Sequence, residues 1–237
     1  MSTPNSLVLT VADGTQAHAY VAQPQTKTAA PGIILCQEAF GVNGHIRHVA
    51  DRLAAAGYVV VAPELFHRTA EPGLEIPYSE FATLAMPHYQ AITPEGLTQD
   101  LRAAYDWLQS QDNVQKDKIG TIGFCLGGQV AFIANATLPL AAAVSYYGGG
   151  THTRTAMAKD LHAPHLFFWG GLDEHISKEQ ITQVIDAVEA AGKPYINTVI
   201  SYADHGFNCD ERPSYNQDAA AEAWALTMAF FQEKLGA

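Results

Sequence analysis

The chain has 237 residues, of which 48% are hydrophobic and 16% are charged. This composition supports a compact core, and the pattern of elements described below favours a single domain over residues 1–237. The formal net charge of −11 argues against nucleic acid or an anionic membrane as a partner. An anionic substrate would therefore need a local cationic patch.

The cysteine content and the N-terminal residues bear on the cellular compartment in which we expect the protein. Three cysteines, Cys36, Cys125 and Cys209, show no paired spacing, so we expect no disulfide framework and a reducing environment. Residues 1–5 are polar, and we see neither a signal peptide nor an apolar run long enough to cross a membrane. We therefore expect a soluble, cytoplasmic protein with no membrane partner.

The first part of the chain predicts a hairpin followed by a βαβ unit. The expected elements are strands 7–11 and 17–21, a buried strand 33–36, a helix 46–53 and a second buried strand 58–63. Asp13-Gly14 is a strong turn signal between the first two strands. Gly57 is a typical residue at the C-terminal end of a helix.

The segment of about 64–95 breaks the regular pattern. It contains four prolines, Pro72, Pro77, Pro87 and Pro94. The segment is too long for an ordinary connection and too apolar for a disordered linker. We expect a partly helical excursion over the carboxyl edge of the sheet.

The second part of the chain alternates strands with helices. The expected elements are helix 97–108, strand 118–124, a helix from Gln129, strands 141–147 and 165–169, helix 178–191, strand 197–202 and helix 219–235. We read Gly148-Gly149-Gly150 as a flexible turn. Buried strands alternating with helices predict an α/β fold, a mostly parallel sheet with helices on both faces.

A cysteine follows the strand at 118–124 in the pattern Gly-x-Cys-x-Gly, formed by Gly123, Cys125 and Gly127. This is the strand–nucleophile–helix turn of an α/β-hydrolase, with cysteine where serine is usual. The sharp turn requires glycines around a strained nucleophile, and the N-terminus of the next helix favours a thiolate. The alternative is a buried structural cysteine beside a glycine-rich turn.

An acid and a histidine follow later strands, where active sites of parallel α/β sheets lie. Asp173 comes just after the strand at 165–169, and His205 comes just after the last strand. Each residue alone is more often structural. The order nucleophile, acid and base is that of the α/β-hydrolase fold, so we predict a triad of Cys125, His205 and Asp173.

From about Gln16 to Leu235 the chain resembles the dienelactone hydrolases (carboxymethylenebutenolidases). The motifs that carry the resemblance are Gln37-Glu38-Ala39-Phe40-Gly41-Val42-Asn43, Gly123-Phe124-Cys125-Leu126-Gly127-Gly128, Tyr146-Tyr147-Gly148, Gly171-Leu172-Asp173 and Asp204-His205-Gly206-Phe207. The resemblance implies that Cys125 is the nucleophile, His205 the base and Asp173 the residue that orients the base.

An oxyanion hole and a gate are expected beside the triad. One oxyanion donor should be the backbone N–H of Leu126, the residue after the nucleophile. The resemblance assigns the second donor to the N–H of Ala39. It also implies that Glu38 contacts the resting thiol and rearranges when substrate binds, so that the thiolate forms only when needed. The alternative for Glu38 is a helix-capping role.

The substrate is where the chain departs from the family it resembles. The resemblance implies an archetype that holds a substrate carboxylate with two arginines, and Cys209 stands at the second of these positions. Arg68 and Arg212 are near in sequence but match neither motif, so we doubt that dienelactone is the natural substrate. The candidate substrate contacts are Phe40, Tyr89, Tyr147, Phe207 and Arg68. The aromatic ones among them suggest an apolar pocket, or are core residues.

These observations predict a cysteine-dependent hydrolase of small esters or lactones that works through an acyl-thioester enzyme. Alternatives are a carboxylesterase or thioesterase for larger acyl groups, another covalent reaction at the same thiol, and a non-catalytic binding or stress-response relative. No His or Cys spacing indicates a metal site, and we expect no cofactor. We expect a monomer or small homo-oligomer with a small-molecule substrate.

Overall fold

A computed structural model of the chain describes residues 5–26 and 28–236. Contacts divide the chain into two compact units, one up to Ile119 and the other Gly120–Gly236. Each unit is described by itself, and the single domain stays a prediction. Within the described residues no helix combines the length and the apolarity that a membrane span requires.

The sheet of the first unit contains the predicted hairpin and the predicted βαβ unit. Its strands are β1 (Ser6–Thr10), β2 (Gln16–Ala22), β3 (Ala30–Cys36) and β4 (Val59–Pro63). β2 pairs antiparallel with both β1 and β4, and β3 pairs parallel with β4. The hairpin turn is closed by Asp13, whose Oδ1 accepts the N–H of Thr15 at 2.9 Å. Both predictions are confirmed.

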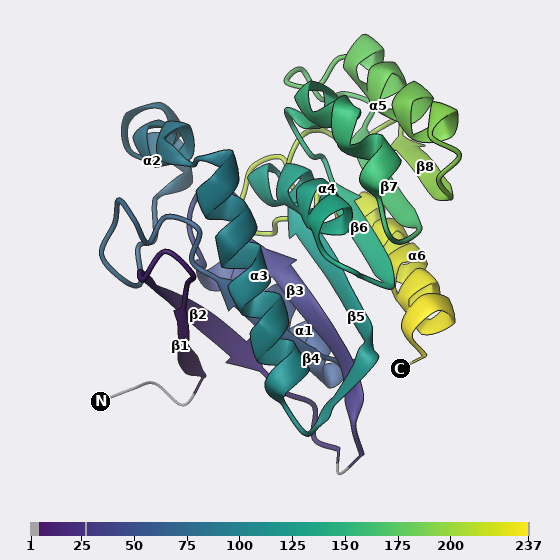
Figure 1. The fold of residues 1–237 in the computed structure, drawn as a ribbon. Coiled ribbons are helices and arrows are strands. Elements are labelled where there is room, and N and C mark those ends of the chain that lie inside the picture. Colours follow the sequence, from purple (N-terminus) through teal and green to yellow (C-terminus); the bar gives the residue numbers. More distant parts are fainter. Residues whose placement is uncertain (1–4, 27, 237) are drawn as a thin grey trace. The chain divides into compact units, whose positions relative to one another are not determined.

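Two helices cover opposite faces of this sheet (Figure 1). α1 (Gly44–Ala55) packs against β2 and β4, and α3 (Pro94–Ser110) packs against β1, β3 and β4. Each helix begins at a side-chain cap, because Asn43 accepts the N–H of Ile46 and Thr93 accepts the N–H of Gly96.

The excursion after β4 is partly helical, as predicted. It contains the short helices η1 (Tyr78–Glu80) and η2 (Phe81–Ala85) and then α2 (Met86–Ala91). The predicted end at residue 95 is wrong, since α3 already begins at Pro94. Proline is favourable in the first turn of a helix, where its missing N–H has no partner to lose.

The strands of the second unit form a parallel array in chain order. They are β5 (Val114–Phe124, whose later part belongs to this unit), β6 (Ala142–Tyr146), β7 (His165–Gly170) and β8 (Tyr195–Ile200). Pairing of Phe124 with Tyr146, and of Tyr146 with Phe168, brings the carboxyl ends of three strands level. The predicted strand 197–202 corresponds to β8, which lies two residues earlier, at Tyr195–Ile200. Ile196 and Val199 are exposed there because β8 lies at the edge of the array.

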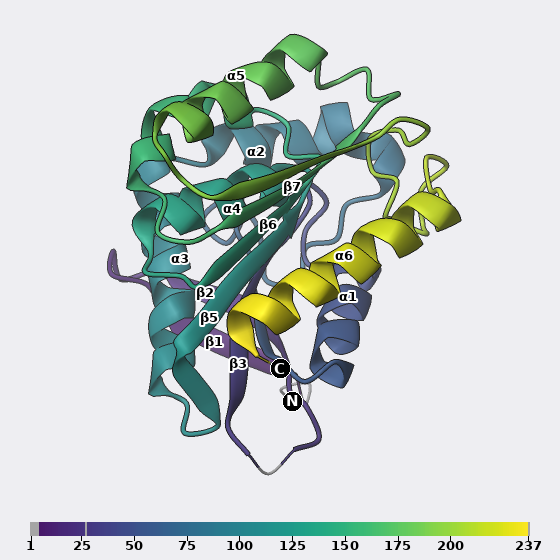
Figure 2. The same ribbon diagram turned by 90° about the vertical axis from the view of Figure 1, so that its right-hand side faces the viewer.

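The second unit carries helices on both faces of its strands. Figure 2 shows α6 (Gln217–Leu235) on one face and α4 (Leu126–Thr137) and α5 (Lys178–Ala190) on the other. A 3-10 helix, η3 (Thr151–Asp160), follows the glycine run after β6 and was not predicted. Its short polar sequence has no helical stripe, and Gly150, with a φ of 82°, starts it.

Candidate active site

Cys125 lies at a sharp turn between β5 and α4, as the Gly-x-Cys-x-Gly pattern predicts. Its φ is 53° and its ψ is −116°, a conformation that residues with a Cβ rarely adopt and that costs about 1–3 kcal/mol. The turn is held by its N–H, which donates to the carbonyl of Tyr146 at 3.1 Å. The helix begins at Leu126, earlier than the predicted Gln129, so its first turn directly follows the sulfur.

The elbow also requires a glycine at Gly128. A Cβ at this position would lie 2.6 Å from the carbonyl oxygen of Tyr146 and 2.7 Å from the Cα of Gly148. Both neighbours are backbone atoms that cannot rotate away. The first turn of α4 therefore packs backbone against backbone on the end of β6.

His205 and Asp173 meet Cys125 in the second unit. The Nε2 of His205 lies 3.2 Å from the Sγ of Cys125, and its Nδ1 lies 2.8 Å from the Oδ2 of Asp173. The other carboxylate oxygen of Asp173 accepts the backbone N–H groups of His175 and Ile176 at 2.8 and 3.2 Å. The carboxylate thereby holds Nδ1 as the donor and turns Nε2 toward the sulfur.

The electrostatics of this trio favour an imidazolium. Burial by itself lowers the pKa of His205. The charge interaction with the Cys125 sulfur and the hydrogen bonds that Asp173 and Cys125 accept from the ring outweigh burial and raise the pKa of His205 to about 10. A proton on the imidazole is thus stabilised by an opposite charge at each ring nitrogen.

Aromatic rings enclose the histidine. The Tyr147 ring lies 5.1 Å from the His205 ring and makes an edge contact with Phe207 at 5.2 Å. Both aromatic residues are fully buried, and Tyr147 has a φ of 37°, the second positive φ among the described non-glycine residues. The ring of His175 contacts His205 edge-on at 5.3 Å. Tyr147 and Phe207 therefore pack around the base, and a contact with substrate stays a prediction.

The loop after β8 brings a cation close to the base. The guanidinium of half-buried Arg212 packs against Gly206, where a Cβ would lie 2.7 Å from its Cζ. Gly206 has a φ of 78° and directly follows His205. Sequence reasoning found Arg212 only by its nearness along the chain, because folding of the loop onto itself has no local signal. Cys209, at the family's arginine position, is buried.

Glu38, Ala39 and Phe40 lie in a buried turn of the first unit, directly after β3. Gln37 next to them accepts the N–H of Leu65 at 3.0 Å, and the carbonyl of Phe40 accepts the N–H of Ile76 at 3.1 Å. The turn is therefore fastened to the excursion. The ring of Phe40 packs on that of Tyr78 at 4.7 Å, and Tyr89 on α2 is half-buried.

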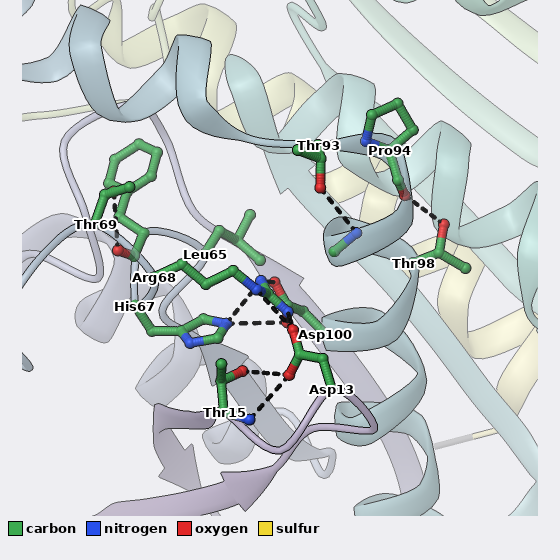
Figure 3. Close-up of polar contacts among 12 residues, drawn as sticks. Asp13, Thr15, Leu65, His67, Arg68, Thr69, Thr93, Pro94, Thr98 and Asp100 are labelled. Carbon is green, nitrogen blue, oxygen red and sulfur yellow. Dashed lines mark hydrogen bonds and ion pairs between the residues drawn. The ribbon is translucent and has the colours of Figure 1, made fainter.

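Arg68, a candidate for a substrate carboxylate, is engaged by two carboxylates of its own unit (Figure 3). Its Nη2 lies 2.7 Å from Asp13 and its Nη1 lies 2.7 Å from Asp100. The ring of His67 also contacts Asp100 at 3.0 Å. The charge of Arg68 is thus compensated by this four-residue set, which we call the Arg68 cluster.

Over residues 5–26 and 28–236, no group of three or more His, Cys, Asp or Glu side chains is placed to hold a metal ion. A thiol on a strained strand-to-helix turn, with its acid and histidine after later parallel strands, defines an α/β-hydrolase site. The fold is shared with known structures. A crystal structure called "Putative Dienelactone Hydrolase" from Klebsiella pneumoniae subsp. pneumoniae MGH 78578 superposes with a TM-score of 0.85 at 28% identity, covering 96% of this chain and 98% of that one.

Sequence comparison identifies the family. The model of the dienelactone hydrolase family matches residues 17–235, and the chain belongs to this family. A "Putative carboxymethylenebutenolidase" of Synechocystis sp. is 34% identical over 230 residues, which cover 91% of each chain. The carboxymethylenebutenolidase of Pseudomonas putida is 35% identical over 176 residues, which cover 72% of this chain and 73% of that one. The chain is therefore a hydrolase of this family, and membership in the family implies a small-molecule substrate.

Proposed function

We propose that this hydrolase cleaves small esters or lactones with Cys125 as nucleophile, through an acyl-thioester enzyme. The observation that carries the proposal is the continuous chain of contacts from sulfur to imidazole at 3.2 Å and from imidazole to carboxylate at 2.8 Å. Nucleophile, base and orienting acid in this arrangement are what acyl transfer requires.

In the first half-reaction the sulfur attacks the carbonyl carbon of the substrate. His205 holds the proton of the thiol, a C–S bond forms, and the carbonyl electrons move onto oxygen. When the tetrahedral intermediate collapses, the C–O bond to the leaving group breaks and His205 returns the proton to the departing alkoxide. The products are an alcohol, or the ring-opened hydroxyl of a lactone, and acylated Cys125.

In the second half-reaction water replaces the sulfur. His205 takes a proton from water, and the resulting hydroxide attacks the thioester carbonyl. Collapse breaks the C–S bond, releases a carboxylic acid and restores the Cys125–His205 pair. Asp173 holds the imidazole in the tautomer that both halves need and stabilises each imidazolium.

The oxyanion of both intermediates needs donors. In this proposal the N–H of Leu126 in the first turn of α4 is one donor, and the N–H of Ala39 is the other. Glu38 gates the thiol in the resting enzyme. Glu38 is fully buried, so it is not a surface residue held in place by solvation alone.

Small, uncharged substrates fit the described surroundings of the base better than carboxylated ones. Two fully buried aromatic rings pack at His205, and the charge of Arg68 is compensated. The guanidinium of Arg212 packs against Gly206, the residue after His205. A carboxylated substrate would depend on Arg212.

The proposal is tested with a panel of aryl acetates, lactones and acyl thioesters assayed on wild-type protein and on Cys125→Ala. We expect turnover of aryl esters and lactones by the wild type, none above background by Cys125→Ala, and a mass increase on Cys125 equal to the acyl group after rapid quenching. Cys36→Ala is the matched control for loss of a thiol. Full turnover by purified Cys125→Ala would overturn the cysteine mechanism, and a preference for long acyl thioesters would favour the thioesterase alternative.

A further inference from the structure

A buried polar network lies directly beneath the elbow in the second unit. Ser145 on β6, His165 on β7 and Asn135 near the end of α4 are each 1% exposed or less. The triad uses none of them. Buried polar groups are costly unless they are hydrogen-bonded. A complete network at this place therefore indicates that these side chains have a specific role.

The hydrogen bonds of the network have a single consistent direction. The hydroxyl of Ser145 donates to the carbonyl of Gly128 at 2.6 Å, so it can only accept from the Nε2 of His165 at 2.8 Å. The Nδ1 of His165 then accepts from the amide of Asn135 at 3.2 Å. Burial lowers the pKa of His165 to about 3, which keeps the ring neutral, as this direction requires.

The far end of the network is anchored independently. Asn135 also donates to the carbonyl of Ala163 at 2.9 Å and accepts the N–H of Ala163 at 2.8 Å. These two bonds tie the end of α4 to the segment that leads into β7. The network therefore joins both ends of α4 to the two strands beneath it.

The near end of the network is the Gly128 peptide. Its N–H donates to the carbonyl of Cys125 at 2.9 Å, and its Cα packs on the backbone of Tyr146 and Gly148. The Ser145 hydroxyl provides a third contact with Gly128, by donating a hydrogen bond to its carbonyl. Gly128 lies two residues after Leu126, so its position sets the direction of the first N–H groups of α4.

We infer that Ser145 is a positioning residue that holds the Gly128 peptide, and through it the oxyanion donor of Leu126, in the orientation needed for acyl transfer. His165 orients the hydroxyl and Asn135 orients His165. This inference rests on the proposed function. It concerns the stabilisation of the oxyanion and leaves the Cys125–His205 contact untouched, and this separation makes it testable.

Two reactions of the same sulfur distinguish oxyanion stabilisation from thiol reactivity. Acylation by p-nitrophenyl acetate passes through an oxyanion, and its rate is the pre-steady-state burst of p-nitrophenolate. Alkylation by iodoacetamide displaces iodide at a saturated carbon and forms no oxyanion. A misplaced donor therefore slows the first reaction and leaves the second unchanged.

Four variants isolate the hydroxyl. Ser145→Ala removes it and leaves the His165 N–H without an acceptor. Ser145→Ala with His165→Phe removes both partners of this bond, so the His165 N–H is not left without an acceptor, and Asn135 keeps its two bonds to Ala163. His165→Phe alone keeps the Ser145–Gly128 bond. Thr227→Val is the matched control, because it removes a buried hydroxyl on α6. This hydroxyl forms a hydrogen bond with the hydroxyl of Tyr146 at 2.7 Å.

We expect both variants that lack the Ser145 hydroxyl to acylate about tenfold more slowly than wild type, a fraction of the effect of deleting an oxyanion donor. Their alkylation rates should stay within about twofold of wild type. His165→Phe, which keeps the hydroxyl and removes the ring that orients it, should slow acylation less than the Ser145 variants do, and Thr227→Val should match wild type in both reactions. A purely structural role would lower the unfolding midpoint without changing the ratio of the two rates.

Two results would overturn the inference. One is an acylation rate of the double variant equal to that of Thr227→Val, and the other is an equal fall in acylation and alkylation. A wild-type protein that alkylates at Cys125 but shows no ester burst would instead overturn the proposed function, and this inference with it.

Discussion

At the scale of single residues, the chemistry depends on the charge of His205. Its pKa in the folded protein, about 10, lies above its ordinary value of 6.5. The imidazolium therefore contributes stability that is fully present below about pH 6.5 and is lost as the pH rises through about 10. Over the neutral range the ring keeps the proton that the proposed mechanism delivers to the leaving group.

Asp173→Asn should lower kcat by about 10³–10⁴-fold, because an amide neither fixes the Nδ1–H tautomer nor stabilises the imidazolium. The same change should move the pKa of His205 from about 10 toward its ordinary value. Steady-state kinetics and an NMR titration of the His205 ring measure the two effects. Glu174→Gln, at the exposed neighbouring residue, should leave both close to wild type. An unchanged kcat in Asp173→Asn would remove Asp173 from the triad.

At the scale of elements, glycines decide how closely the elbow approaches β6. Gly128→Ala should destabilise the fold by about 2–3 kcal/mol, since its Cβ would meet two backbone groups at 2.6 and 2.7 Å. This cost outweighs the gain in helix propensity. Gly149→Ala is the matched control, because a Cβ there meets nothing within 4 Å. Denaturant unfolding compares the two, and equal stability would contradict the close packing.

The Arg68 cluster joins three elements of the first unit (Figure 3). Asp13 comes from the β1–β2 turn, Arg68 from the segment after β4, and Asp100 from α3. Asp100 is 2% exposed and depends on its partners for charge compensation. The hydrogen bonds from Thr15, together with Arg68, hold the pKa of Asp13 well below its usual range.

Arg68→Ala should therefore lower the free energy of unfolding by about 2–4 kcal/mol, because it leaves the buried Asp100 carboxylate without its main partner. Arg102→Ala removes an exposed ion pair with Asp106 and should change the free energy of unfolding by less than about 0.5 kcal/mol. Both are measured by urea unfolding at neutral pH. A loss in Arg68→Ala no larger than in Arg102→Ala would contradict the role of the cluster.

The cluster also has a predicted pH dependence. Because the folded pKa of Asp13 is lowered, its contribution to stability is present above its ordinary value, 3.8, and is lost as the pH falls below it. Wild-type protein should thus lose stability on acidification more steeply than Asp13→Asn. Parallel acid-unfolding curves of the two proteins would contradict this assignment.

At the scale of the whole molecule, the net charge of −11 opposes the approach of anions. With neutral esters, kcat/KM should be insensitive to ionic strength. With carboxylated esters, kcat/KM should rise with salt if repulsion dominates, and should fall with salt if Arg212 binds the carboxylate. Arg212→Met, measured on the same two substrates, separates the two cases. If Arg212 binds the carboxylate, this variant should lower kcat/KM for the carboxylated ester alone.

The sequence alone was sufficient for the fold class and the order of most elements, and it predicted a triad from three residues that follow strands. Buried apolar runs, helical stripes and turn glycines are local patterns, and each reports its own segment. Cys125, Asp173 and His205 were found because each follows a predicted strand, and parallel strands place such residues at one edge. The bounds of β8 were predicted two residues late and the helix η3 was not predicted, since neither has a pattern that distinguishes it locally.

Only the tertiary structure showed what holds these parts. Ser145, His165 and Asn135 are ordinary core-strand and helix residues in the sequence, and their bonds join positions 17–30 residues apart. Arg68 changed from a possible substrate ligand to the centre of an ion-pair cluster whose partners lie 32 and 55 residues away. Hydrogen bonds and ion pairs of this kind depend on side-chain direction and burial. The folded chain sets both, and no local pattern encodes them.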